Sequence, residues 1–272
     1  MQPECLFRNI GNEYPDEFNS CSKYFSMFTN LGFLFRSKHE GKRKLLARYS
    51  VLPFYKEVES SVLEAGYELL NNYSQHFLIA NFQYYNYIKQ YTPETFFNLS
   101  DVPNDGPFVV KGVTNSRKFN WNTLMFAPTK KDAINIACDL DADSLISSQQ
   151  KIIRRYIPLE TFEIGINGLR FTNEWRCFCY GTEVISIGYY WSNASDAENI
   201  NGNSQYRSEV NIFASKISKI MGEFVTFYAI DVAKTENGDW IVIEINDGQM
   251  SGLSMNDPDI LYQKLAIMME EV

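Results

Sequence analysis

Apolar and polar residues alternate along the first hundred positions in a way that predicts short strands separated by helices. The strands are predicted in residues 5–8, 45–51 and 67–70, and the helices in residues 16–27, 54–65 and 76–90. Gly66 is expected to end the helix over 54–65. Strand followed by helix is the pattern of an open α/β layer, which we therefore expect at the N-terminus.

A strong turn signal at residues 105–107, Asp-Gly-Pro, separates this unit from a second one. The apolar pattern then predicts an antiparallel sheet and flanking helices. The strands are predicted in residues 108–111, 152–156, 162–166, 175–180 and 184–190, a hairpin in 224–232 and 240–245, and the helices in 130–140, 210–221 and 258–270. The polar residues 196–204 are expected to form a mobile loop. We predict an N-terminal domain over 1–104 and a second domain over 105–272.

Composition favours a folded, intracellular protein. The chain has 272 residues, 45% of them hydrophobic. Its formal net charge of −8 argues against binding of nucleic acid through an overall basic surface. It contains no apolar run long enough to span a membrane, so we expect a cytoplasmic protein without membrane contact. Five cysteines with no CxxC pair suggest neither a disulfide framework nor a zinc site, and Cys177 and Cys179 are expected to be buried thiols.

The last hairpin carries the strongest local signal for chemistry. Asp231 ends one apolar strand, and Glu244 and Asn246 lie two positions apart on its partner, so that their side chains leave the same face of the sheet. Three oxygen ligands at one place suit Mg²⁺. The alternative is that these residues line the solvated face of an edge hairpin, and spacing alone leaves that alternative equally open.

Basic residues on neighbouring strands could bind phosphate. Lys111 lies at the end of an apolar strand before Gly112 and a polar loop that includes Lys118, although the Walker pattern is absent. A surface lysine at a strand end is the commoner alternative. Arg154 and Arg176 stand within apolar strands, where a guanidinium requires an acidic or phosphate partner. Glu160, Glu163 and Glu174 are the candidate partners for a purely structural ion pair.

The remaining polar residues give weaker signals. The two histidines, His39 and His76, have no nucleophile motif nearby and are expected at the surface or at a helix cap. The basic run over 38–48 could contact phosphates, but such runs are usually solvated faces.

In order and residue type these segments resemble the ATP-grasp superfamily. The resemblance rests on FVVKG at 108–112, IIRRYIPLE at 152–160, EWRCF at 174–178 and AIDVAKTENGDWIVIEINDGQMSG at 229–252. Residues 47–57 and 69–76 look like the preceding domain of one subgroup, marked by two arginines and a lysine and proposed to contain RNA-repair ligases. The resemblance implies an α/β (α+β) protein, an ATP-grasp fold with an N-terminal Rossmann-like pre-ATP-grasp domain.

The resemblance also implies roles for individual residues. Lys111 would contact ATP, with Lys118 beside it, and the backbone of Arg155, Tyr156 and Ile157 would receive the adenine. Arg154 and Arg176 would clamp phosphates or the reacting group, and Asp231, Glu244 and Asn246 would hold Mg²⁺, or Mn²⁺ in its place. The sequence departs from the family in having Arg155 where many members carry an acidic hinge residue, and in lacking a second lysine near residues 80–82.

Three functions follow from these features. The first is an ATP-dependent RNA ligase acting on RNA ends in repair, with Lys111 as the nucleophile if the enzyme itself becomes adenylated. The second is a ligase that joins a carboxylate to an amine, in a peptide or small metabolite, through an acyl phosphate, which the acidic balance fits equally well. A nucleotide-binding module without catalysis is the third, and the complete set of candidate metal ligands argues against it.

Overall fold

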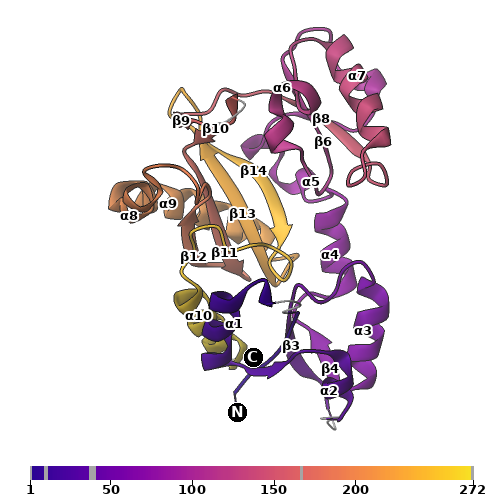
Figure 1. The fold of residues 1–272 in the computed structure, drawn as a ribbon, viewed down its shortest axis with the longest axis vertical. Helices are drawn as coiled ribbons and strands as arrows, with labels where there is room; N and C mark the ends of the chain where they lie inside the picture. Colours follow the sequence, from indigo (N-terminus) through magenta and orange to yellow (C-terminus); the bar gives the residue numbers. More distant parts are fainter. Residues whose placement is uncertain (1, 9–11, 37–40, 166–167, 271–272) are drawn as a thin grey trace.

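The computed structural model describes residues 2–8, 12–36, 41–165 and 168–270. Figure 1 shows three layers along its long axis, with a parallel sheet at one end, a large antiparallel sheet in the middle and a smaller sheet with two helices at the other end. The described residues of the first hundred positions thus confirm the predicted α/β layer.

The N-terminal layer is a parallel sheet in the order β2-β1-β3-β4. Its strands are β1 (Glu4–Phe7), β2 (Ser26–Phe28), β3 (Arg43–Arg48) and β4 (Tyr67–Leu69), and its helices are α1 (Pro15–Tyr24), α2 (Leu31–Arg36), α3 (Tyr55–Glu64) and α4 (Tyr73–Ala80). Gly66 follows α3 with a φ of 87°, which confirms it as the helix stop. The helix predicted over 16–27 was too long, because residues 26–28 pair with β1 as a strand.

The smaller sheet has the order β5-β8-β6-β7 and is antiparallel. It consists of β5 (Thr95–Phe96), β6 (Phe108–Gly112), β7 (Phe126–Ala127) and β8 (Lys151–Arg155), covered by α6 (Trp121–Leu124) and α7 (Lys130–Asp139). Thr129 caps α7 by accepting a hydrogen bond from the amide of Asp132. The domain boundary at residues 104 and 105 stays a prediction; β5, which precedes it, pairs with β8.

The large sheet has the order β12-β11-β13-β14 and is antiparallel throughout. Its strands are β11 (Glu174–Tyr180), β12 (Glu183–Tyr189), β13 (Phe227–Lys234) and β14 (Trp240–Asp247), and a separate hairpin consists of β9 (Thr161–Ile164) and β10 (Arg170–Thr172). One face packs on α9 (Ser204–Met221) and the other on α10 (Pro258–Glu270) and the N-terminal layer. Cys177 and Cys179 are buried on β11, as predicted.

Several predicted elements were wrong in extent or arrangement. The strands predicted between residues 152 and 190 were expected in one antiparallel sheet, but they belong to three. Part of the strand predicted over 162–166, and Asn167 after it, lie outside the described residues. The loop predicted over 196–204 contains α8 (Ala197–Gly202), and α9 begins at Ser204, six residues before the predicted start, because Asn203 accepts hydrogen bonds from the amides of residues 205 and 206.

The helix predicted over 76–90 is interrupted. It begins at Tyr73, where Asn72 and Gln75 form a reciprocal cap, and it ends at Ala80. Phe82 has a φ of 57°, which a helix cannot contain, and a short second helix, α5 (Tyr85–Ile88), follows before a 3₁₀ turn at Lys89–Tyr91. This break turns the chain from the N-terminal layer toward the smaller sheet (Figure 1).

Candidate nucleotide site and adjoining cavity

A pocket of about 930 Å³ lies between the smaller sheet and strand β14 of the large sheet. Its wall is largely apolar, with Val109 and Met125 on one side and Ile241 and Ile243 on the other. Charged residues also line it, namely Lys111, Lys118, Arg154, Arg155, Arg170, Glu174 and Glu244. An apolar slot with converging charges is the form expected for a site that binds a flat ring attached to an anionic group.

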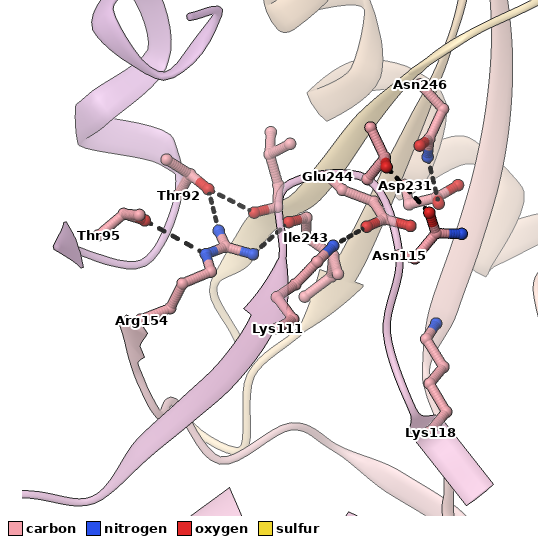
Figure 2. A network of polar contacts seen from close by, with 12 residues as sticks. Thr92, Thr95, Lys111, Asn115, Lys118, Arg154, Asp231, Ile243, Glu244 and Asn246 are labelled. Carbon is pink, nitrogen blue, oxygen red and sulfur yellow. Dashed lines mark hydrogen bonds and ion pairs between the residues drawn. The ribbon is translucent and has the colours of Figure 1, made fainter. Parts of the chain in front are cut away.

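Lys111 reaches into this pocket from the end of β6. It is 5% exposed, and its ammonium group forms an ion pair with the carboxylate of Glu244 on β14 (Figure 2). Burial alone would raise the pKa of Glu244, but the charges of Lys111 and Lys118 outweigh it and hold that pKa well below its usual range. Lys111 is therefore not the surface lysine of the alternative interpretation.

Arg154 lies on β8, buried, with neutral hydrogen-bond acceptors around it. Its guanidinium donates to Thr92 Oγ1 at 2.7 Å, to Thr95 Oγ1 at 3.3 Å and to the carbonyl oxygen of Ile243 at 2.5 Å (Figure 2). Burial lowers the pKa of Arg154 from its ordinary value, yet a guanidinium stays charged in proteins. Within the described part of the chain Arg154 has no carboxylate partner, so the alternative of a structural ion pair does not hold for this residue.

Arg176 on β11 forms a structural ion pair, as the alternative interpretation allowed, but its partner is an aspartate. It donates two hydrogen bonds to Asp231 on β13, at 2.8 and 2.7 Å, and one to the carbonyl oxygen of Gly252 at 2.8 Å. None of the three glutamates considered for it is its ion-pair partner in the described residues. Burial raises the pKa of Asp231, although Arg176 and its hydrogen bonds oppose that shift. The pair joins two neighbouring strands of the large sheet.

The loop after β6 brings Lys118 across the pocket. Its ammonium lies 3.9 Å from the ring centre of Tyr190, 5.0 Å from that of Trp191 and 3.5 Å from a carboxylate oxygen of Glu174. Burial alone would lower the pKa of Lys118, but the charge of Glu174 raises it above the ordinary value. Glu174 also lines the pocket, although its sequence context suggested only a structural ion-pair partner. Glu174 stands two residues before Arg176, so the two side chains leave the same face of β11, and this spacing could have indicated that Glu174 belongs to the site.

The segment from Arg155 to Ile157 lines the rim of the same pocket. The amides of Arg155 and Tyr156 donate to the carbonyl oxygens of Glu94 and Pro107, at 2.8 and 3.0 Å. The amide of Ile157 has no hydrogen-bond partner among the residues that the structure describes, so it is the backbone donor left for a ligand.

The three predicted metal ligands lie together but differ in access. Asp231 and Glu244 are paired across β13 and β14, and Asn246 donates to Asp231 at 3.2 Å (Figure 2). Two carboxylates and an amide oxygen form a hard donor set that fits Mg²⁺. Glu244 and Asn246 line the cavities, whereas Asp231 is fully buried behind Arg176. In the described residues, histidine, cysteine and carboxylate side chains alone form no group of three that could hold a metal.

A second, larger cavity of about 1920 Å³ adjoins the pocket. Glu244 and Ser116 line both spaces, so the two are neighbours at these residues. The second cavity extends past the end of β14 to helices α3 and α4, and Arg176, Asn246 and His76 contribute to its wall. His76 was expected at the surface or at a cap; it is instead partly buried, with its side chain 13% exposed. His39 lies outside the described residues.

In the described part of the chain, every helix is too short or too polar to cross a membrane.

No match is found among curated protein sequences. The profile of one family matches residues 99–265; it describes an ATP-grasp domain, family 3 of the clade named for two arginines and a lysine. This range contains every residue that the sequence predicted for the site.

Solved structures of low sequence identity share the fold. The D-alanine–D-alanine ligase of Bacillus anthracis aligns over 100% of this chain and 96% of its own, with a TM-score of 0.58 and 14% identity. The ATP-grasp ligase PsnB bound to its minimal precursor aligns over 99% of both chains, with a TM-score of 0.59 and 10% identity. D-cycloserine synthetase DcsG covers 97% of this chain and 99% of its own, with a TM-score of 0.53 and 12% identity.

These likenesses agree with the architecture predicted from the sequence motifs, and at such identities they establish the fold alone. The family match covers more than half of the chain and names the clade that the two arginines and the lysine suggested. The prediction of an ATP-dependent ligase is thereby confirmed at the level of the family. This chain belongs to the ATP-grasp domain family, in family 3 of the clade named for two arginines and a lysine.

Proposed function

We propose that this chain is an ATP- and Mg²⁺-dependent ligase that joins a carboxylate to an amine through an acyl phosphate. The observation that carries the proposal is the meeting of the pocket and the larger cavity beside Glu244. A nucleotide in the first space and an acceptor in the second would be held next to each other. Such juxtaposition removes much of the entropic barrier to transfer between two substrates.

In this proposal ATP occupies the pocket between the smaller sheet and β14. The free amide of Ile157 would bind the adenine edge, within the Arg155–Ile157 segment, and the apolar walls would enclose the ring. Lys111, Lys118 and Arg154 would face the phosphates. Support comes from Arg154, whose buried charge has only neutral partners in the described residues and is therefore available to an anion.

Glu244 and Asn246 would hold Mg²⁺, or Mn²⁺ in its place, because both line the cavities and supply hard oxygen donors. Asp231 would complete the set of ligands through those lone pairs of its carboxylate oxygens that do not accept hydrogen bonds from Arg176 and Asn246. When bound, the metal would neutralise charge on the transferring phosphoryl group.

The chemistry then needs two transfers. An oxygen of the donor carboxylate attacks the terminal phosphorus of ATP, and ADP leaves. The amine nitrogen next attacks the carbonyl carbon of the acyl phosphate, phosphate leaves, and a proton leaves the nitrogen. Arg176, which lines the acceptor cavity, would bind the donor carboxylate or the phosphate that departs from it.

Joining of RNA ends is the alternative function. The sequence supports it through the resemblance to the subgroup, through the arginines and through the basic run over 38–48. In the described part of that run every cation has a carboxylate partner. Lys42 and Lys44 lie 3.0 and 3.1 Å from Glu68, Arg43 lies 3.7 Å from Glu4, and Arg48 is fully buried against Glu17. This pairing leaves little positive charge for an RNA backbone and favours the amide-forming ligase, acting in the cytoplasm as its composition predicts.

The nucleotide product distinguishes the two functions. The protein is incubated with ATP labelled in the adenine ring and Mg²⁺, in one series with mixtures of amino acids and amines and in another with nicked RNA. We expect labelled ADP in the first series and no joined RNA in the second. Labelled AMP that appears together with joined RNA would contradict the proposal and establish the alternative.

A further inference from the structure

His76 and Asp247 form a hydrogen-bonded pair in the wall of the larger cavity. His76 lies on α4, and its Nδ1 is 2.9 Å from Oδ2 of Asp247 at the end of β14. Both residues line the cavity, but Asp247 is nearly buried, its side chain being 3% exposed. The pair joins the N-terminal layer to the sheet that carries the predicted metal ligands.

Asp247 is fixed by three further groups. Its Oδ1 accepts hydrogen bonds from Asn71 Nδ2 at 2.7 Å and from the amide of Gln249 at 2.9 Å, and the Tyr55 hydroxyl lies 3.4 Å from Oδ2. The imidazole of His76 stacks on the ring of Tyr55, with ring centres 4.1 Å apart and planes at 20°. The carboxylate and the ring plane are therefore both held, and Oδ2 makes its shortest contact with the histidine.

This arrangement fixes the tautomer of His76. A carboxylate oxygen accepts hydrogen bonds, so the 2.9 Å contact between Nδ1 and Oδ2 makes Nδ1 of His76 the donor toward Asp247. The second ring nitrogen, Nε2, has no hydrogen-bond partner among the described residues, and the ring lines the cavity. An imidazole whose Nδ1 is held by a carboxylate, and whose Nε2 is left free beside a cavity, has the geometry that a general base requires.

We propose that His76 is the general base of the amine-transfer step and that Asp247 is its positioning residue. The inference rests on the proposed function. As the acceptor nitrogen attacks the acyl phosphate, the C–N bond forms and the C–O bond to phosphate breaks. The proton released by the nitrogen goes to Nε2 of His76, the phosphate leaves with the electron pair of the broken bond, and the imidazolium later returns the proton to solvent. The acceptor is therefore an amine that enters the cavity from the α3–α4 side.

Two substitutions separate this role from a structural one. His76→Asn places an amide N–H near the position of Nδ1, so that the hydrogen bond to Asp247 is kept and only the base is lost. Asp247→Asn keeps the base but changes its tautomer. Asn71 and the amide of Gln249 hold the carbonyl oxygen of the new side chain at the Oδ1 position, its NH₂ then faces Nδ1, and the proton of His76 moves to Nε2.

The kinetic test compares two acceptors in the full chain. Each standard amino acid is offered as carboxylate donor with ATP and Mg²⁺, and the acyl phosphate is captured either by hydroxylamine, a strong nucleophile that needs no base, or by ammonia and amino acids. We expect both variants to form hydroxamate at the wild-type rate and to lose about a hundredfold or more in amide formation. Equal amide formation in His76→Asn and wild type would overturn the inference, as would a parallel fall in hydroxamate and amide.

NMR spectroscopy of the His76 tautomer distinguishes failure of the inference from failure of the proposed function. The chain has two histidines, so His39→Gln leaves a single imidazole for ¹⁵N NMR. At about pH 8 we expect the Nδ1–H tautomer, and the Nε2–H tautomer after Asp247→Asn. An Nε2–H tautomer in the parent protein overturns the inference whatever the substrate is. The expected tautomer with no hydroxamate from any donor overturns the proposed function, and the role of His76 with it.

Discussion

Lys111 on β6 and Glu244 on β14 are 133 positions apart in the sequence and form a buried ion pair between two sheets. The pair lines the proposed nucleotide pocket, and Glu244 also faces the second cavity. Each charge compensates the other, and both side chains are largely buried. Any ligand that takes over one partner must therefore satisfy the other, which couples the lysine to the predicted metal site.

A double-mutant cycle measures this coupling. Lys111→Met and Glu244→Gln should each reduce the free energy of unfolding, because each leaves a buried charge without its partner. The double variant should lose less than the sum, by a coupling energy of about 1–3 kcal/mol in urea titrations. The pKa of Glu244 is held below its ordinary 4.5, so the coupling should be fully present above that pH and fade as the pH falls through the lower folded value. Additive single effects at neutral pH would contradict the ion pair.

Glu244→Gln should abolish ATP-dependent turnover while the protein remains folded. The substitution keeps the size of the side chain and removes the carboxylate that faces both cavities. Turnover is followed by release of ADP, and folding by circular dichroism. Asp239→Asn is the control, because Asp239 is exposed in the β13–β14 turn of the same sheet. Full activity in Glu244→Gln would remove this residue from the metal site.

Lys111→Ala should weaken the binding of Mg²⁺–ADP by tenfold or more, since a charged hydrogen bond contributes about 1.5–3 kcal/mol. Isothermal titration calorimetry gives the dissociation constant. Lys131→Ala, an exposed lysine on α7, should bind as the wild type does. An unchanged affinity in Lys111→Ala would exclude this lysine from the phosphate site.

Arg154→Met should separate phosphate binding from adenine binding. The guanidinium is held by three neutral oxygens and has no carboxylate partner in the described chain, so its charge is available to a phosphate. We expect the affinity for ADP to fall by tenfold or more and the affinity for adenosine to stay unchanged. Equal losses for the two ligands, measured by the same calorimetry, would indicate that Arg154 only supports the fold.

Local patterning predicted most of the secondary structure, and its failures have physical causes. Strand order was inaccessible because pairing across β11 and β13 depends on contacts that are far apart in the chain. The two-residue strands β5 and β7 are too short to show the alternation of apolar and polar residues that marks a strand. The break at Phe82 arises because this fully buried ring packs under Arg154, a tertiary contact that overrides the helical pattern.

The residues of the candidate site were easier to predict from the sequence than the residues with which they form hydrogen bonds and ion pairs. Asp231, Glu244 and Asn246 come from one hairpin, so a period of two was enough to bring them together. The partners of Arg154 and Arg176 come from other elements, which spacing cannot reveal. His76 was missed for the same reason, because the significance of this residue depends on Asp247, which lies 171 positions away.

A crystal structure with Mg²⁺ and a non-hydrolysable ATP analogue would show directly where the nucleotide and the metal bind. We predict adenine at the amide of Ile157, phosphates against Lys111 and Arg154, and metal density on Glu244 and Asn246. A nucleotide bound elsewhere, or in this pocket with its phosphates directed away from Glu244, would contradict this prediction.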